Sequence, residues 1–172
     1  IMPITQLIYP IVTQKISDNV EEGVLFVKKL MPIFNLMAVL LFFGAIIVGP
    51  FILYLLFGAQ FLDAIPILWV LSFTLVLILY STVFGILLMV NLGMDHLFFK
   101  NQLYVAIFSI LLTILVLPYG AGMTSAIILV ASEIMITAYQ YYCLKSKGYQ
   151  LFNLDMLTKK AFLDAVKAIK IH

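Results

Sequence analysis

The sequence contains no arginine and has only one cysteine and one tryptophan in 172 residues. Charge is scarce as well: ten lysines and eight acidic residues make up 10% of the chain, whereas 65% of its residues are hydrophobic. The mean hydropathy is +1.17. A soluble domain of 19.4 kDa has too little interior for so many apolar side chains. Most of the chain is therefore expected to lie in lipid.

These shortages exclude several classes of function. The single Cys143 cannot form an intrachain disulfide. The scattered lysines build no basic face interleaved with aromatics, so no nucleic acid partner is expected. His96 and His172 lack metal-ligand spacing, no glycine-rich phosphate loop is present, and no nucleophile has a base nearby. We expect no enzyme activity, no catalytic residues, no cofactor and no metal.

Long apolar runs are what the sequence does contain, at 33–57, 66–92, 101–117 and 121–143. About 20 helical residues cross a hydrocarbon core of about 30 Å. In lipid every backbone amide needs an internal partner, and the runs lack the alternation of barrel strands. The predicted fold class is all-α: a polytopic membrane helix bundle with four complete transmembrane helices.

The two ends of the chain have a different character. The apolar opening "IMPITQLIYPIVTQ" predicts the end of a fifth membrane helix of a longer protein. Residues 1–154 are expected to form one membrane domain. The tail 155–172 alternates apolar and basic residues at helical spacing, which predicts an amphipathic helix on the inner leaflet or the start of a further helix.

Threading the four runs alternately through a membrane puts all ten lysines on one side. The positive-inside tendency makes that side cytoplasmic, so the C-terminus is expected in the cytoplasm. Asp63 and Asp95 precede the second and third runs, and we interpret both as helix N-caps.

Glu133 is the exception to the apolar pattern, because it lies well inside the fourth run. Placing an acid near mid-bilayer costs about 2.5 to 3.5 kcal/mol on insertion scales, so the side chain should face protein or water. Thr137 and Gln140 follow at i+4 and i+7 and form a polar stripe with it. The stripe either lines a transport path, with Glu133 in proton or cation coupling, or holds the bundle together by hydrogen bonds.

Two further features concern the contacts of the spans. Lys100, at the cytoplasmic end of the third run, is either an interfacial anchor or a first contact for a lipid-linked phosphate. Small residues predict close helix approach at Ser81, Gly85, Ala121, Ser125, Ala131 and Ser132.

Three stretches carry a family resemblance: "GPFILYLLFGAQFLDAIPILWVLSF" at 49–73, "LGMDHLFFKNQ" at 92–102 and "LVLPYGAGMTSAIILVASEI" at 115–134. In this order they resemble the C-terminal half of polysaccharide biosynthesis flippases. These are the exporters of lipid-linked oligosaccharide, including lipopolysaccharide O-antigen, in the multidrug, oligosaccharidyl-lipid and polysaccharide exporter superfamily.

The resemblance implies that residues 1–154 are part of the C-terminal lobe of a larger transporter. Such a protein flips undecaprenyl-phosphate-linked oligosaccharide across the bacterial inner (plasma) membrane by alternating access. Its implied partners are that substrate, membrane lipids, the N-terminal lobe of the same protein and a polysaccharide polymerase. The family commonly has basic residues in a central cavity, whereas this chain has no arginine and no lysine deep in a span. Those cations would come from the other lobe, or the substrate contacts differ.

Two other functions remain open. One is a drug or cation antiporter of the same superfamily, which differs in substrate rather than in fold. The other is a non-transporting scaffold subunit of a polysaccharide assembly complex.

Overall fold

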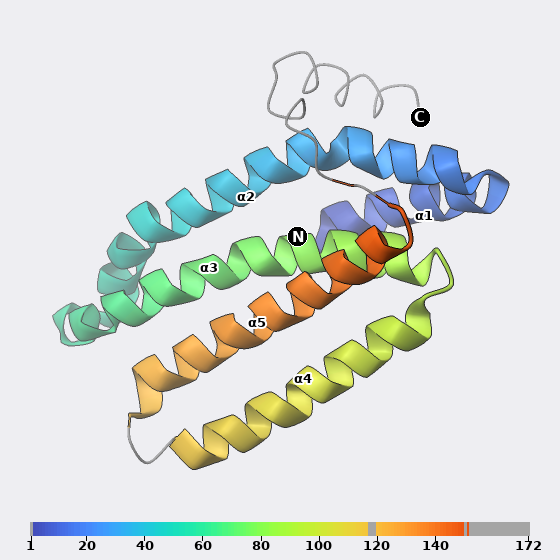
Figure 1. Ribbon diagram of the computed structural model, residues 1–172. Coiled ribbons are helices and arrows are strands. Elements are labelled where there is room, and N and C mark those ends of the chain that lie inside the picture. The colour runs from blue at the N-terminus through green and yellow to red at the C-terminus, as the bar shows by residue number, and fades with distance from the viewer. Residues whose placement is uncertain (1, 117–119, 150, 152–172) are drawn as a thin grey trace.

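The computed structural model describes residues 2–116, 120–149 and 151. They form α1 (Met2–Asp18), α2 (Val20–Phe57), the 3-10 helix η1 (Ala59–Ala64), α3 (Ile65–Ser81), the π-helical segment η2 (Thr82–Val90), α4 (Asp95–Val116) and α5 (Ala121–Ser146) (Figure 1). No strand occurs in these ranges. The all-α prediction is confirmed for the described residues, and the predicted tail helix at 155–172 lies outside them.

Four helical segments are long and apolar enough to cross a membrane: Val20–Phe57, Ala59–Val90, Asp95–Val116 and Gly122–Ser146. They contain the four predicted runs almost entirely. The predicted helix at the start of the chain is present as α1, a shorter helix that packs against α2 and η2. In the described part of the chain the fold is therefore a bundle of four such helices with α1 beside it.

The first span begins earlier than its apolar run. Asn19 accepts hydrogen bonds from the backbone N–H groups of Glu21 (2.9 Å) and Glu22 (3.4 Å), which caps α2 at its start. The acidic side chains of the first turn suit the positive end of the helix dipole. With 38 residues α2 is about 57 Å long, so its beginning extends well beyond a hydrocarbon core of about 30 Å.

The predicted carboxylate caps are wrong. Asp63 lies within η1, and α3 begins after Ala64 without a side-chain cap, although Pro66 lies in its first turn as expected. Asp95 is itself the first residue of α4. The turn is made instead by Gly58, which has a φ of +79° and donates its N–H to the Tyr54 carbonyl (2.8 Å). Glycine reaches this left-handed conformation without the steric cost that a side chain brings.

The lysines of the described chain gather at one end of the bundle. The α1–α2 junction, the 91–94 turn and the end of α5 lie together there, while the α2–α3 turn lies at the other end (Figure 1). We call the end of the bundle that holds the α1–α2 junction the lysine end. It carries Lys15, Lys28, Lys29, Lys100, Lys145 and Lys147. This arrangement agrees with the alternate threading of the spans.

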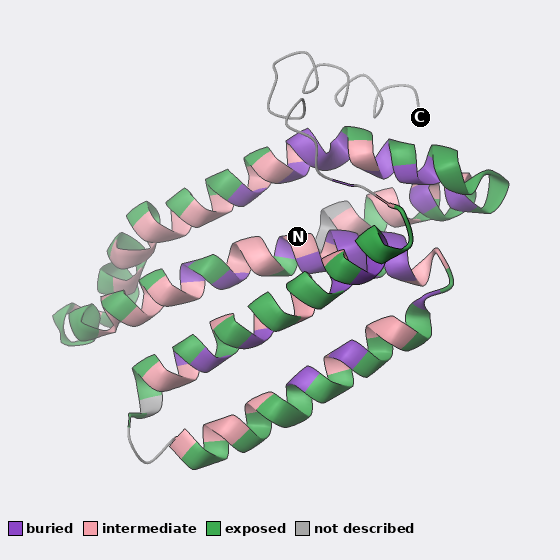
Figure 2. Cartoon of the chain, viewed as in Figure 1, coloured by how far each residue is buried: buried purple, intermediate pink, exposed green. Residues whose placement is uncertain are grey.

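Packing is densest at the lysine end. The core cluster joins α1, the first half of α2, η2 and the end of α5, and includes Val27, Leu30, Leu87, Leu88 and Leu144. Buried residues, drawn in purple, accordingly concentrate at this end in Figure 2. Toward the other end of α2, Ile47 is 70% exposed and Leu55 is 69% exposed. The lysine end is therefore the closed half of the bundle, and the other half presents apolar side chains outward.

The α1–α2 contact depends on Gly23. A Cβ at this position would lie 2.8 Å from the Cα and N of Ile16 and would also meet its side chain. We expect Gly23→Ala to lower the free energy of unfolding by about 1 to 3 kcal/mol, because the α1 backbone must move away. Thermal unfolding of the purified protein in detergent measures this.

Gly44→Ala is the matched control, because Gly44 lies in the same helix with nothing within 4 Å of its Cβ position. The free energy of unfolding of Gly44→Ala should be unchanged, or raised by up to about 1 kcal/mol because alanine has the higher helix propensity. Equal stability of the two variants would contradict the close α1–α2 packing.

Candidate functional site

Three of the predicted site residues share one face of α5, and this face packs against α3 and η2. The Thr137 hydroxyl donates to the Leu77 carbonyl of α3 (3.3 Å). Gln140 is fully buried against Gly85 of η2. Glu133 lies one turn before Thr137 and is half-buried. The structure therefore brings Glu133, Thr137 and Gln140 together at one helix interface.

α3 contributes polar side chains to the same interface. Ile67, Thr74 and Ser81 are spaced by seven residues, which places them along one side of a helix. Ile67 lies against the start of α5, because a Cβ on Gly122 would be 2.9 Å from its Cδ1 atom. Thr74 and Ser81 are 6% and 9% exposed, respectively. We define the polar seam as Thr74, Ser81, Glu133, Thr137 and Gln140.

The seam contains polar atoms without partners. Gln140 is 0% exposed, and neither its Nε2 nor its Oε1 atom is hydrogen-bonded within the described chain; the same holds for the Oγ1 atom of buried Thr74. Leaving such a group unpaired costs about 1 to 3 kcal/mol. Native proteins seldom retain buried unpaired groups, and a bound water, ion or ligand group is one explanation of them.

Glu133 and Thr74 lie near the same level of the bundle. α3 and α5 run in the same direction, and Thr137 contacts the Leu77 carbonyl. Thr74 precedes Leu77 by three residues and Glu133 precedes Thr137 by four, so they lie about 4.5 Å and about 6 Å from this contact, both toward the beginning of their helices. An acid and an unpaired hydroxyl are thereby placed at one depth in the membrane.

The helix beside Gln140 has unusual geometry. η2 is π-helical over nine residues, whereas π-helices mostly occur as single-turn bulges, frequently at functional sites. Gly85 lies within it, and a Cβ there would be 2.8 Å from both Gln140 Nε2 and Phe98 Cδ2. The predicted close approach at Gly85 is therefore present, and it makes room for the buried amide.

A different side of α5 contacts α4. Asn101 donates from Nδ2 to the Ile136 carbonyl (3.1 Å), and the Ser109 and Ser132 hydroxyls are hydrogen-bonded to each other. These bonds join two spans in the way that polar side chains join helices in membranes. Ser132 thus makes the predicted helix contact, whereas Ala131 is exposed on the described surface.

Lys100 does not belong to the seam. It is exposed in the second turn of α4 at the lysine end, while its neighbour Asn101 turns inward. Asn101 and Thr74 are not among the site residues predicted from the sequence. The seven-residue spacing of Thr74 and Ser81 is a signal that could have indicated a polar side of the second span.

Among the described residues, no three His, Cys, Asp or Glu side chains come together as a metal site. The chain matches no protein-family model, no curated protein and no solved structure. Function is therefore inferred from the residues and their placement.

The buried amide leads to a stability prediction. Gln140→Leu keeps a similar volume but removes two unpaired polar atoms, so it should raise the free energy of unfolding by about 1 to 3 kcal/mol. Gln14→Leu, at an exposed position of α1, should change it by less than about 0.5 kcal/mol. Unfolding in detergent measures both variants. A less stable Gln140→Leu protein would show that the amide is satisfied by a bound partner.

Proposed function

We propose that the chain is part of a flippase that moves undecaprenyl-phosphate-linked oligosaccharide across the bacterial inner membrane by alternating access. The observation that carries this proposal is the polar seam between two apolar spans, with unpaired groups on Thr74 and Gln140. The ordered resemblance of 49–73, 92–102 and 115–134 to polysaccharide flippases supports the substrate class.

A transport role explains why polar groups are retained in the seam although burying them within a span is energetically unfavourable. An acid within a span, like Glu133, is expensive in lipid, and such residues commonly mark substrate or ion pathways. In the proposed mechanism Glu133 takes part in proton or cation coupling, while Thr137 and Gln140 line the pathway beside it. Lys100, exposed at the lysine end, is a first contact for the lipid-linked phosphate on the cytoplasmic side.

The uneven packing suits alternating access. The lysine end joins α1, α2, η2 and α5 in one core, whereas the opposite half of α2 carries exposed apolar side chains. In the proposed cycle the packed end moves as one unit with its lobe. The exposed apolar half meets lipid and the N-terminal lobe of the same protein.

One observation favours a second candidate, the drug or cation antiporter. The charged side chain of the seam is acidic, and the described lysines lie at the lysine end rather than within the seam. A negative group facing the interior suits a cationic substrate or coupling ion. The two transporters share the seam and differ in what passes along it, so substrate assays separate them.

Cysteine accessibility separates both transporters from a scaffold. In a Cys143→Ser background, single cysteines at Thr74, Thr137 and Gln140 should react with a membrane-impermeant thiol reagent applied to intact cells or to inside-out vesicles, because an alternating-access pathway admits water from each side in turn. Cysteines at Leu129 and Ile134, which are exposed on α5 within its span, should stay unreactive in lipid. If the three seam positions react no more than these two, the scaffold subunit is the better assignment.

Glu133→Gln tests the coupling role directly. We expect transport of lipid-linked oligosaccharide into proteoliposomes by the whole protein to fall about tenfold or more, equivalent to about 1.4 kcal/mol in the transition state. Glu22→Gln, an exposed acid at the start of α2, should transport normally. Full transport by Glu133→Gln at every pH and ion condition would remove Glu133 from the mechanism. Drug efflux without oligosaccharide transport by the unmodified protein would favour the antiporter.

A further inference from the structure

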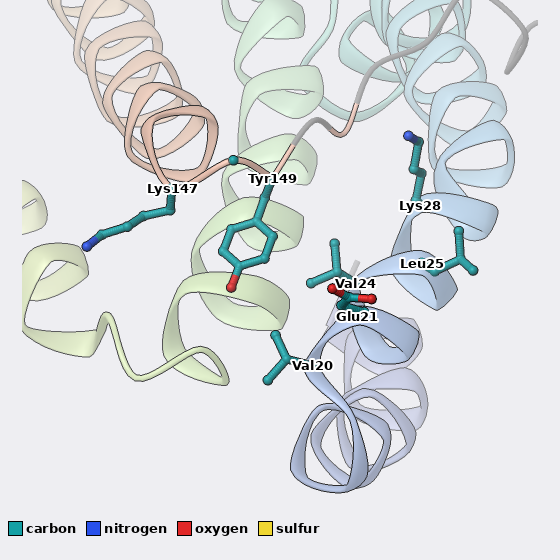
Figure 3. Close-up of a pocket in the computed structure, with 8 residues that line it drawn as sticks. Val20, Glu21, Val24, Leu25, Lys28, Lys147 and Tyr149 are labelled. Atoms are coloured by element: carbon teal, nitrogen blue, oxygen red, sulfur yellow. The ribbon is translucent and has the colours of Figure 1, made fainter.

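A pocket of about 700 Å³ opens at the lysine end, away from the polar seam. One wall is the beginning of α2, where Glu21, Val24 and Lys28 line it, and the other is the segment after α5 with Lys147 and Tyr149 (Figure 3). Glu21, Val24 and Lys28 follow i, i+3, i+7 spacing, so they share one side of the helix. Residues far apart in the sequence thus form a single concave surface.

Both walls are held in place by hydrogen bonds, one set made by a side chain and the other by the backbone. Asn19 fixes the start of α2 through its bonds to the Glu21 and Glu22 amides. On the other wall, the Tyr149 N–H donates to the Leu144 carbonyl (3.0 Å), which folds the segment back over the end of α5. Tyr149 also packs against the hydrophobic core. The pocket is therefore a feature of ordered elements.

The pocket lies where the apolar helix α5 ends. α5 ends at Ser146, and the pocket residues Lys147 and Tyr149 follow within three positions of that end. The lysines of the described chain gather at the same end. Basic pockets at the ends of membrane helices are typical binding places for phosphate-bearing headgroups.

The lining restricts which ligand fits. Lys28 and Lys147 supply cations, Glu21 supplies an anion, and the α2 wall adds aliphatic side chains, of which Val20 is 41% exposed and Leu25 is 49% exposed. The Glu21 carboxylate would repel a simple anion. A purely apolar ligand would leave the charges of Glu21, Lys28 and Lys147 without a partner. A phosphate with an attached ammonium group and apolar glycerol esters complements all of these groups.

We propose that this pocket binds the headgroup of phosphatidylethanolamine. In Figure 3 Lys28 and Lys147 lie on either side of Tyr149 with their ammonium groups pointing away from each other. Rotation about their flexible side-chain bonds would bring both ammonium groups toward a phosphate bound between them. The Glu21 carboxylate accepts hydrogen bonds from the primary ammonium of the lipid. Val20, Val24 and Leu25 contact the glycerol and the first methylenes of its acyl chains. This lipid site uses none of the seam residues, so it does not depend on the transport proposal.

Native mass spectrometry of the delipidated whole protein, titrated with phosphatidylethanolamine, tests the proposal. Phosphatidylcholine and phosphatidylglycerol are the comparison lipids: the first has a quaternary ammonium that cannot donate a hydrogen bond, and the second has no ammonium. We expect phosphatidylethanolamine to bind about tenfold more tightly than either, a difference that one charge-assisted hydrogen bond can supply.

Each charged residue of the pocket has a matched control nearby in the sequence. Lys28→Gln, Lys147→Gln and Glu21→Gln should each weaken binding of phosphatidylethanolamine about tenfold. Lys29→Gln, Lys145→Gln and Glu22→Gln make the same charge changes at exposed positions that do not line the pocket, and they should bind normally. Glu21→Gln should also make the affinities for phosphatidylethanolamine and phosphatidylglycerol equal.

Three results would overturn the proposal. Equal losses in the pocket variants and their controls would mean that only surface charge attracts lipid. Tighter binding of phosphatidylglycerol than of phosphatidylethanolamine would exclude the role of Glu21. Normal binding by Lys28→Gln and Lys147→Gln would exclude the pocket. Thermal unfolding without added lipid confirms that each variant is folded.

Discussion

In lipid a polar group has no water to bond with, so it must find its partner within the protein or remain unpaired at a cost. This constraint produces the helices, which satisfy their own backbone amides. It also accounts for the bonds between them: the Tyr80 hydroxyl of α3 donates to Asn35 of α2 (2.7 Å), and Asn101 of α4 donates to the Ile136 carbonyl of α5. The bundle is held partly by these bonds, because packing in lipid gains little from the hydrophobic effect.

The exceptions to this rule occur together. Buried Thr74 and Gln140 have polar atoms without partners in the described chain, and both lie where α3 and η2 meet α5, beside the half-buried Glu133. The π-helical segment η2 adds an irregular backbone at the same place. Unsatisfied groups scattered over the bundle would suggest poor packing, whereas their concentration at one interface suggests a site where another polar species enters.

The lysine end has a different physical character. There α1, the start of α2, η2 and the end of α5 share one dense core, and the pocket between Glu21, Lys28 and Lys147 opens at its rim. A headgroup bound at this rim would connect the first turns of α2 with the end of α5. Such a lipid would add support to the closed end of the bundle without contacting a residue of the polar seam.

Hydropathy and length alone predicted the four spans, their alternation and the common end of the six described lysines, because the cost of exposing apolar or charged groups to the wrong medium depends mainly on residue type. The spacing of Glu133, Thr137 and Gln140 also placed them correctly on one helix face. Helical periodicity does not say which neighbouring helix that face meets, however. Asn101 turning inward beside exposed Lys100 and Gly85 making room for Gln140 both depend on how the helices dock. Those contacts join residues distant in the sequence, so local patterns carry no information about them.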